Sequence, residues 1–250
     1  MQRVLEPGLV SVITATHNRP LFIRKAIDLF EAQTWPKKEM IIIDDGAAGI
    51  VPTLLPENVR HVRLTSPTWI THKHRLAFPL CRGEFVGYWD DDDYFGPRRL
   101  ALQAQHLMEG KADAVGFHVK VLVSVPDPRF WKWSRKTLDK WDREAKPGFD
   151  AGLPFHDGTA LWRHELLEGV PEARLQGSQL DLMRTLRAGG ARLAELPNDD
   201  TFVYVRHSRV GWDFDVRELC DPVDCPRWIP REMLAFWALP TLADEGVKRG

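Results

Sequence analysis

Short apolar strands alternate with amphipathic helices through the first half of this chain, and that alternation limits the folds it can adopt. Apolar runs typical of buried strands occupy residues 9–14, 39–43, 61–64, 84–89 and 114–119. Helical periodicity occupies 21–33, about 97–108 and part of 71–83. Strands and helices that alternate at this spacing predict a mainly parallel sheet, covered by helices on both faces.

Polar and acidic side chains directly follow three of these expected strands. Thr16 and His17 follow the first strand, Asp44 and Asp45 follow the second, and Asp90–Asp93 follow the strand at 84–89. The carboxyl ends of parallel strands meet at one edge of a sheet, where ligands bind in folds of this class. We therefore expect these residues to line one cleft.

The second half of the chain is less regular. Residues 158–168 read as a strand that turns into a short helix, 180–188 as a helix, and 201–205 as a late strand. A segment at about 126–152 carries Trp131, Trp133 and Trp141 among basic residues, and we expect an irregular flap or insertion there. Its aromatic rings suit either of two roles, stacking on an acceptor or packing the insertion onto the core.

Charge, cysteine content and the N-terminal sequence narrow the possible partners and location. The 34 Lys and Arg against 35 Asp and Glu give a formal net charge of −1, which argues against holding nucleic acid by bulk positive charge. The three cysteines cannot all pair and show no zinc-binding spacing, so we expect reduced thiols in the cytoplasm. The apolar stretch at 9–14 is too short for a signal peptide or a membrane span, which leaves peripheral membrane association open.

Four adjacent aspartates in the segment WDDDDYFGP carry the most chemical information. Their side chains repel one another unless a cation neutralises them, and Mg2+ or Mn2+ prefers oxygen ligands. In an extended segment alternate side chains share a side, so Asp90 and Asp92 are expected to face one ion. The alternative is a solvated acidic turn with Asp93 near the N-terminus of the next helix. The position of the cluster directly after an apolar strand favours the metal site.

The motifs VSVITATHNRP, IIIDDG and GEFVGYWDDDDYFGP, in this order, resemble the GT-A domain of family 2 glycosyltransferases. DGTALWRHELLE, LDLMRTLRAGG and VYVRHSRVGW resemble later segments of that domain, so the resemblance covers roughly 9–212. It implies a Rossmann-like three-layer α/β/α sandwich with a mainly parallel mixed sheet. The domain would occupy 1–212, with a nucleotide-sugar-binding half at about 1–110 and an acceptor-side half at about 111–212. Residues 213–250 would form a C-terminal extension packed on it.

The resemblance further implies transfer of a sugar from a nucleotide-diphosphate donor, with a uridine-type donor favoured and inversion at the anomeric carbon. The residues that would line the donor site are Thr14, Ala15, Thr16, His17, Arg19, Asp45, Lys73, Arg75, Asp90 and Asp91. Asp45 would accept a hydrogen bond from the imide N–H of the base. Asp44 is equally suited to capping a turn, and a solvated helix face is the alternative for Lys73 and Arg75.

The cofactor that the resemblance implies is Mn2+ or Mg2+, with Asp92, Asp90 and His207 as ligands. Asp92 would bind the ion that bridges the diphosphate, because a divalent cation neutralises the charge that develops on the leaving nucleotide. Asp90 or Asp91 would hold the ribose or a metal-bound water. Arg206 and Arg209 would assist at the phosphates, and a packing role is the alternative for His207.

The sequence departs from the family at the usual position of the catalytic base. Many relatives read Gly-Glu-Asp there, whereas this chain reads GSQLD at 177–181. Gln179 stands at the base position, and an amide cannot accept a proton at neutral pH. We predict Asp181 as the base, although two positions along a helix turn a side chain by about 200° and such a carboxylate commonly serves the helix N-terminus. His156 and Asp157 are further candidates on the acceptor side.

Two functional hypotheses follow, an active metal-dependent inverting glycosyltransferase and a sugar-nucleotide-binding protein impaired in catalysis by Gln179. A nucleotide-sugar pyrophosphorylase or a dinucleotide-dependent dehydrogenase would need a glycine-rich phosphate loop near the first strand, which ATHNRP does not provide. The acceptor stays open among a glycan, a lipid-linked sugar, a peptide, a small molecule and a modified nucleobase. The oligomeric state also stays open.

Overall fold

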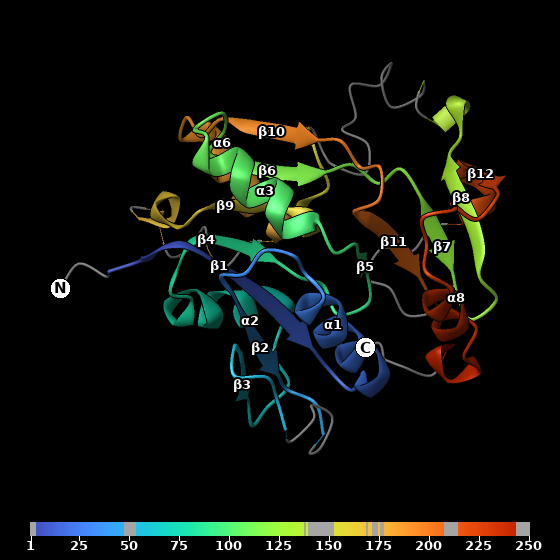
Figure 1. The fold of residues 1–250 in the computed structure, drawn as a ribbon, viewed down its shortest axis with the longest axis horizontal. Helices are drawn as coiled ribbons and strands as arrows, with labels where there is room; N and C mark the ends of the chain where they lie inside the picture. The colour runs from blue at the N-terminus through green and yellow to red at the C-terminus, as the bar shows by residue number, and fades with distance from the viewer. Residues whose placement is uncertain are drawn as a thin grey trace.

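The computed structural model describes residues 4–47, 54–137, 139, 153–168, 170–171, 175, 178–207 and 215–243. Within these residues the strands form a seven-stranded sheet and a five-stranded sheet (Figure 1). The larger sheet runs from β10 near the top of Figure 1 to β3 near the bottom, and the smaller sheet lies to its right.

The seven-stranded sheet is mixed but mainly parallel, as the sequence predicts. Its strands are β1 (Glu6–Thr16), β2 (Lys38–Asp44), β3 (Val59–Arg63), β4 (Gly83–Tyr88), β6 (Ala114–Phe117), β9 (Leu161–Arg163) and β10 (Leu193–Leu196). Their spatial order is β10-β6-β9-β4-β1-β2-β3. β1 pairs in parallel with β2 and β4, whereas β9 pairs antiparallel with β4 and β6.

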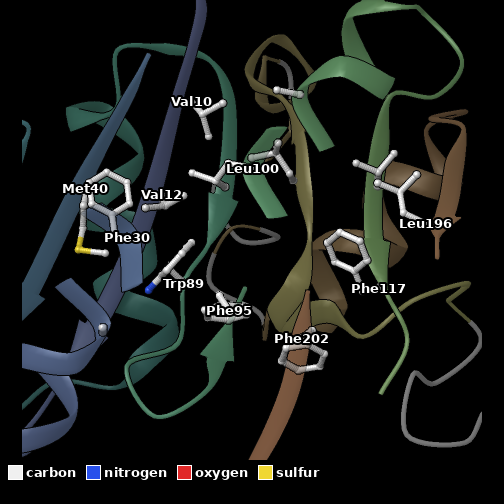
Figure 2. Close-up of a cluster of buried hydrophobic side chains, with 14 of the residues drawn as sticks. Val10, Val12, Phe30, Met40, Trp89, Phe95, Leu100, Phe117, Leu196 and Phe202 are labelled. Atoms are coloured by element: carbon white, nitrogen blue, oxygen red, sulfur yellow. The ribbon is translucent and has the colours of Figure 1, made fainter. Parts of the chain in front are cut away.

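Helices cover both faces of this sheet. On one face lie α1 (Pro20–Glu31) and α3 (Arg99–Met108), and on the other lie α2 (Ile70–Ala77) and α6 (Gln179–Ala188). The alternation of side chains along β1 explains the two cores, because Val10 and Val12 join the cluster under α1 and α3 while Ile13 joins the opposite cluster. Figure 2 shows Val10 and Val12 in the first of these clusters. The predicted three-layer sandwich is confirmed.

The five-stranded sheet contains segments that the sequence pattern did not resolve. Its strands are β5 (Tyr94–Phe95), β7 (Leu122–Ser124), β8 (Arg129–Trp133), β11 (Phe202–Arg206) and β12 (Cys220–Val223), in the order β12-β8-β7-β11-β5. Phe95 and Phe202, both drawn in Figure 2, stack with ring centroids 5.6 Å apart. The core under α1 and α3 therefore continues into the smaller sheet.

The prediction of an irregular flap at 126–152 is wrong for residues 129–133, which form β8. Trp131 is 9% exposed, joins the hydrophobic core and donates its indole N–H to Ser124 Oγ at 3.0 Å. Burial of its aromatic side chain thus favours a paired strand over a flap. Trp141, the third tryptophan of this segment, lies outside the described residues.

The C-terminal segment packs on the smaller sheet. β12 pairs antiparallel with β8, and α8 (Arg231–Trp237) inserts Met233 and Trp237 into a third hydrophobic cluster together with residues of β7 and β11. Figure 1 shows α8 beside these strands. The short α7 (Val216–Leu219) leads into β12. The predicted domain boundary after residue 212 stays a prediction, since 208–214 lie outside the described residues.

Candidate functional site

The loops that follow β1, β2 and β4 lie next to one another because these strands are parallel neighbours. The register sets Thr16 beside Asp44 and Ile13 beside Tyr88. Thr16 Oγ1 donates to Asp91 Oδ2 at 2.6 Å, which joins the end of β1 to the acidic loop after β4. The polar strand ends that we expected to meet are in contact.

Asp45 is the centre of a buried polar cluster beyond β2. Its Oδ1 accepts hydrogen bonds from Lys73 Nζ at 2.6 Å and His17 Nδ1 at 2.8 Å. Its Oδ2 accepts one from the Thr68 backbone N–H at 2.5 Å. Burial opposes ionisation, but the hydrogen bonds from Lys73 and Thr68 and the Lys73 charge lower the pKa of Asp45 to about 2.

Asp44, the neighbouring acidic residue, closes a turn. Its Oδ1 accepts from the Gly46 backbone N–H at 2.7 Å, and its Oδ2 lies 3.2 Å from His61 Nε2. The side chain is buried at 1% exposure. This geometry matches the turn-capping alternative for Asp44.

The four consecutive aspartates Asp90–Asp93, here named the acidic tetrad, differ in their partners. Arg19 Nη1 donates both to Asp91 Oδ1 at 2.8 Å and to Asp92 Oδ2 at 2.7 Å. His207 Nε2 lies 3.1 Å from the same Asp92 oxygen. Burial opposes ionisation of Asp92, but Arg19 and His207 hold the pKa of its carboxyl below its ordinary value. Asp92 is therefore ionised at neutral pH.

The outer members of the tetrad contact other elements. Asp90 Oδ1 accepts from Gln179 Nε2 at 3.2 Å, and Asp93 Oδ1 accepts from the Val205 backbone N–H at 2.9 Å. Burial and the charge of Asp92 raise the pKa of Asp90 to about 7. Asp93 thus fixes the tetrad to β11, and Asp90 connects it to the start of α6.

The residues expected to hold a metal are partly brought together. Among the described residues, no group of three or more His, Cys, Asp or Glu side chains is arranged to hold a metal ion. Asp92 and His207 lie side by side, whereas Asp90 contacts Gln179. An oxygen and an imidazole nitrogen fit two coordination positions of Mn2+ or Mg2+, whose shell commonly includes waters and substrate phosphates.

Asp181, which we predicted as the base, lies in a capping box at the N-terminus of α6. Its Oδ2 accepts hydrogen bonds from the Ser178 backbone N–H at 3.0 Å and from Ser178 Oγ at 2.8 Å. The Asp181 backbone N–H in turn donates to Ser178 Oγ. The Asp181 side chain is 53% exposed. Its carboxylate therefore caps α6, which is the alternative role stated for Asp181 in the sequence analysis.

Asp157 is a carboxyl group closer to the tetrad. It lies in the turn Asp157–Thr159 before β9, with its side chain 21% exposed, and it accepts a hydrogen bond from the Leu180 backbone N–H at the start of α6. Burial raises its pKa to about 6, and its charge contributes to the raised pKa of Asp90. Asp157 and Gln179 thus both lie beside Asp90.

Other residues predicted for the donor site lie in varied environments. Thr14 is completely buried within β1, whereas Ala15 is half-buried. Arg75 Nη2 lies 3.1 Å from His72 Nδ1 on α2. Arg206 is buried at the end of β11, and Arg209 lies outside the described residues.

Sequence reasoning missed Arg99, which lies behind the tetrad. Its side chain is fully buried, its guanidinium carbon lies 3.9 Å from the centroid of the Phe95 ring, and its Nη2 donates to the Tyr88 carbonyl at 2.7 Å and the Thr159 carbonyl at 3.2 Å. Arg99 therefore ties the end of β4 to the turn before β9. The available signal was a basic residue on the apolar face of α3.

The sequence profile described as Glycosyl transferase family 2 matches residues 11–170, which include the second half of β1, β2 to β4, the acidic tetrad and β9. The chain belongs to this family. Curated relatives include the putative glycosyltransferase EpsH of Bacillus subtilis, 26% identical over 101 residues, which cover 37% of this chain and 28% of EpsH. The uncharacterized protein Rv1520 of Mycobacterium tuberculosis is 26% identical over 118 residues, covering 44% of this chain and 34% of that protein. The chain thus matches about a third of the length of these relatives.

Solved structures of similar fold include complexes with nucleotide sugars. S. aureus TarS 1–349 in complex with UDP-GlcNAc matches with a TM-score of 0.56 and 18% identity, over 82% of this chain and 60% of that chain. The mannosyltransferase PcManGT from Pyrobaculum calidifontis, in complex with GDP-Man and Mn2+, matches with a TM-score of 0.56 and 22% identity, over 79% of this chain and 56% of that one. These similarities establish a GT-A fold.

In the part of the chain that the structure describes, no helix has the length and apolar character needed to span a membrane.

Proposed function

We propose that this chain transfers a sugar from a nucleotide-diphosphate donor to an acceptor hydroxyl, with inversion at the anomeric carbon and with Mn2+ or Mg2+ bound. The observation that carries the proposal is the contact between the ends of β1, β2 and β4. These ends set the Asp45 cluster next to the acidic tetrad. Lys73 links the two groups, because Nζ donates both to Asp45 Oδ1 and to the Thr16 carbonyl.

Asp45 is suited to hold the base of a uridine-type donor. Its low pKa keeps the carboxylate ionised, and an ionised carboxylate oxygen would accept the imide N–H of the base. Lys73 and His17 fix the orientation of the carboxylate before the donor binds. Two of the solved structures of similar fold contain UDP-GlcNAc and GDP-Man, so the base itself needs a direct test.

Asp92 and His207 are the residues that would hold the divalent cation. When bound, the ion would neutralise the charge that develops on the departing nucleotide diphosphate. Asp92 is ionised at neutral pH, and its contact with His207 orients the imidazole. Asp91 would act nearby by anchoring the loop to Thr16.

Asp157 is the carboxylate that we propose as general base in place of the Asp181 assignment made from sequence. Direct displacement with inversion needs a base that deprotonates the acceptor hydroxyl. Asp157 lies beside Asp90 with a pKa of about 6, close to the value suited to a base at neutral pH, whereas Asp181 caps α6. The neighbouring amide of Gln179 would then position Asp90 through its hydrogen bond.

A nucleotide-sugar-binding protein without transfer activity is the second candidate function. It is favoured by one contact, the hydrogen bond from Gln179 to Asp90, because the resemblance described under the sequence analysis implies an acidic side chain at the position of Gln179. This candidate predicts that donors bind in the presence of Mn2+ and are not turned over.

Release of nucleotide diphosphate distinguishes the two candidates. The purified chain is incubated with Mn2+, a panel of UDP- and GDP-sugars, and mixtures of glycan, lipid-linked and peptide acceptors. Transfer predicts release from at least one donor, and Asp92→Asn lowers that rate at least about tenfold through loss of a cation ligand. Asp199→Asn, at a carboxylate 78% exposed that pairs with Lys120, is the matched control and leaves the rate unchanged. Binding without release would favour the second candidate, and absence of binding to every donor would contradict both.

A further inference from the structure

Arg19 occupies a position in the acidic tetrad that a cation would otherwise take. It is the residue before α1, yet its side chain does not cap that helix. One nitrogen, Nη1, donates to Asp91 Oδ1 at 2.8 Å and to Asp92 Oδ2 at 2.7 Å. The side chain of Arg19 is 20% exposed, so the guanidinium is partly enclosed but still borders solvent.

The oxygen that Arg19 contacts is the one nearest the candidate imidazole ligand. Asp92 Oδ2 lies 2.7 Å from Arg19 Nη1 and 3.1 Å from His207 Nε2. A divalent cation shared by Asp92 and His207 would need this oxygen, and the positive guanidinium would repel the ion. Arg19 and the cation therefore compete for the same oxygen of Asp92.

We propose that Arg19 is a built-in counter-ion that competes with the divalent cation for Asp92 and leaves it when a nucleotide diphosphate binds. This inference rests on the proposed function, since the diphosphate provides the second partner. A guanidinium pairs with phosphate oxygens as readily as with carboxylates. In the nucleotide-free protein Arg19 neutralises Asp91 and Asp92, and with nucleotide bound it contacts the phosphates. Cation and nucleotide consequently bind with positive cooperativity.

Mn2+ binding in the absence of nucleotide tests this competition. The EPR signal of free Mn2+ is titrated with the wild-type chain, with Arg19→Met and with Arg24→Met, a control that removes an exposed positive charge from α1. We expect Arg19→Met to bind Mn2+ about tenfold more tightly than the wild type. In this variant Mn2+ does not have to displace the charge-assisted hydrogen bond between Arg19 and Asp92. Arg24→Met should match the wild type. Equal Mn2+ affinity of wild type and Arg19→Met would overturn the inference.

Thermal unfolding provides a second readout that also reports whether Arg19→Met folds. Removal of Arg19 leaves Asp91, whose side chain is 2% exposed, without its counter-charge, so the variant should melt at a lower temperature than the wild type. Added Mn2+ should raise the melting temperature of Arg19→Met more than that of the wild type. Arg19→Lys, which keeps the charge, should resemble the wild type. Equal Mn2+-induced shifts in Arg19→Met and wild type would count against the competition.

Addition of UDP separates failure of this inference from failure of the proposed function. UDP should raise the Mn2+ affinity of the wild type toward that of Arg19→Met. If UDP binds to none of the variants, the proposed function fails, while the affinities measured without UDP still decide whether Arg19 competes with the cation. If UDP binds but leaves the wild-type affinity for Mn2+ unchanged, the release of Arg19 by nucleotide is wrong.

Discussion

At the scale of single residues, identical side chains in one short segment acquire different chemistry from their neighbours. Asp92 is held ionised by Arg19 and His207, whereas burial and the charge of Asp92 raise the pKa of Asp90 to about 7. The sequence predicted an acidic site here, but it could not assign these roles. The partners lie more than seventy residues away in the chain for Arg19 and more than a hundred for His207.

Asp157 and Asp181 are the two candidates for the general base, and replacing each with asparagine distinguishes between them. Asp157→Asn should lower the transfer rate at least about a hundredfold, in line with the loss of a general base, while nucleotide binding is kept. Asp181→Asn should leave the transfer rate within about twofold and lower helix stability by about 1 kcal/mol through loss of the capping box. Transfer assays and urea unfolding measure both effects. Loss of transfer in Asp181→Asn alone would restore the assignment made from sequence.

His74 predicts how stability responds to acid. Burial, followed by the charge of Lys73, lowers the pKa of His74 to about 3 in the folded chain, below the ordinary value of 6.5. Between these values the unfolded chain takes up a proton that the folded chain does not, so stability present above pH 6.5 is lost as pH falls. The slope from this group approaches about 1.4 kcal/mol per pH unit. Urea unfolding from pH 7 to pH 4 should show a shallower decline for His74→Gln than for the wild type, and identical slopes would contradict the assignment.

At the scale of elements, the hydrophobic periodicity of the sequence predicted the long buried strands. It did not predict a short strand that pairs with a distant segment of the chain. The strands expected at 9–14, 39–43 and 84–89 appear as β1, β2 and β4, because each is a buried apolar run that any parallel sheet can accept. β8 was missed; it lies between its neighbour β7 and β12, and β12 comes about ninety residues later in the chain. Short strands in the smaller sheet have too few residues to show a period.

The 3₁₀ turn before β9 positions Asp90, and one glycine tests this. A Cβ on Gly158 would lie 2.5 Å from Asp90 Oδ2 and 3.1 Å from the His156 ring. Gly158→Ala should therefore displace Asp90 and weaken donor binding by about tenfold or more, because a small displacement of a group that contacts the donor lowers its affinity. Gly189→Ala, where the nearest atom would be 3.4 Å away, is the matched control. Calorimetric affinities compare the two, and unchanged donor affinity in folded Gly158→Ala would contradict the positioning role.

At the scale of the whole molecule, a net charge of −1 conceals a sorted distribution. Acidic groups gather beyond β2 and β4, and Lys73 and Arg19 neutralise them from α2 and from the loop after β1. Total composition cannot reveal this arrangement, because it arises only when parallel strands set their carboxyl ends side by side. β11, β12 and α8 extend the fold beyond the residues that the family profile matches, whereas β5, β7 and β8 lie within them.

The most direct test of the account is calorimetric titration of the chain with UDP, with and without Mn2+. The strand-end site predicts that UDP binds more tightly when Mn2+ is present, and that Asp92→Asn loses at least about tenfold of that affinity while Asp199→Asn keeps it. A result in which UDP binds equally well to wild type and Asp92→Asn in the presence of Mn2+ would contradict the account. The nucleotide diphosphate would then lie away from the acidic tetrad.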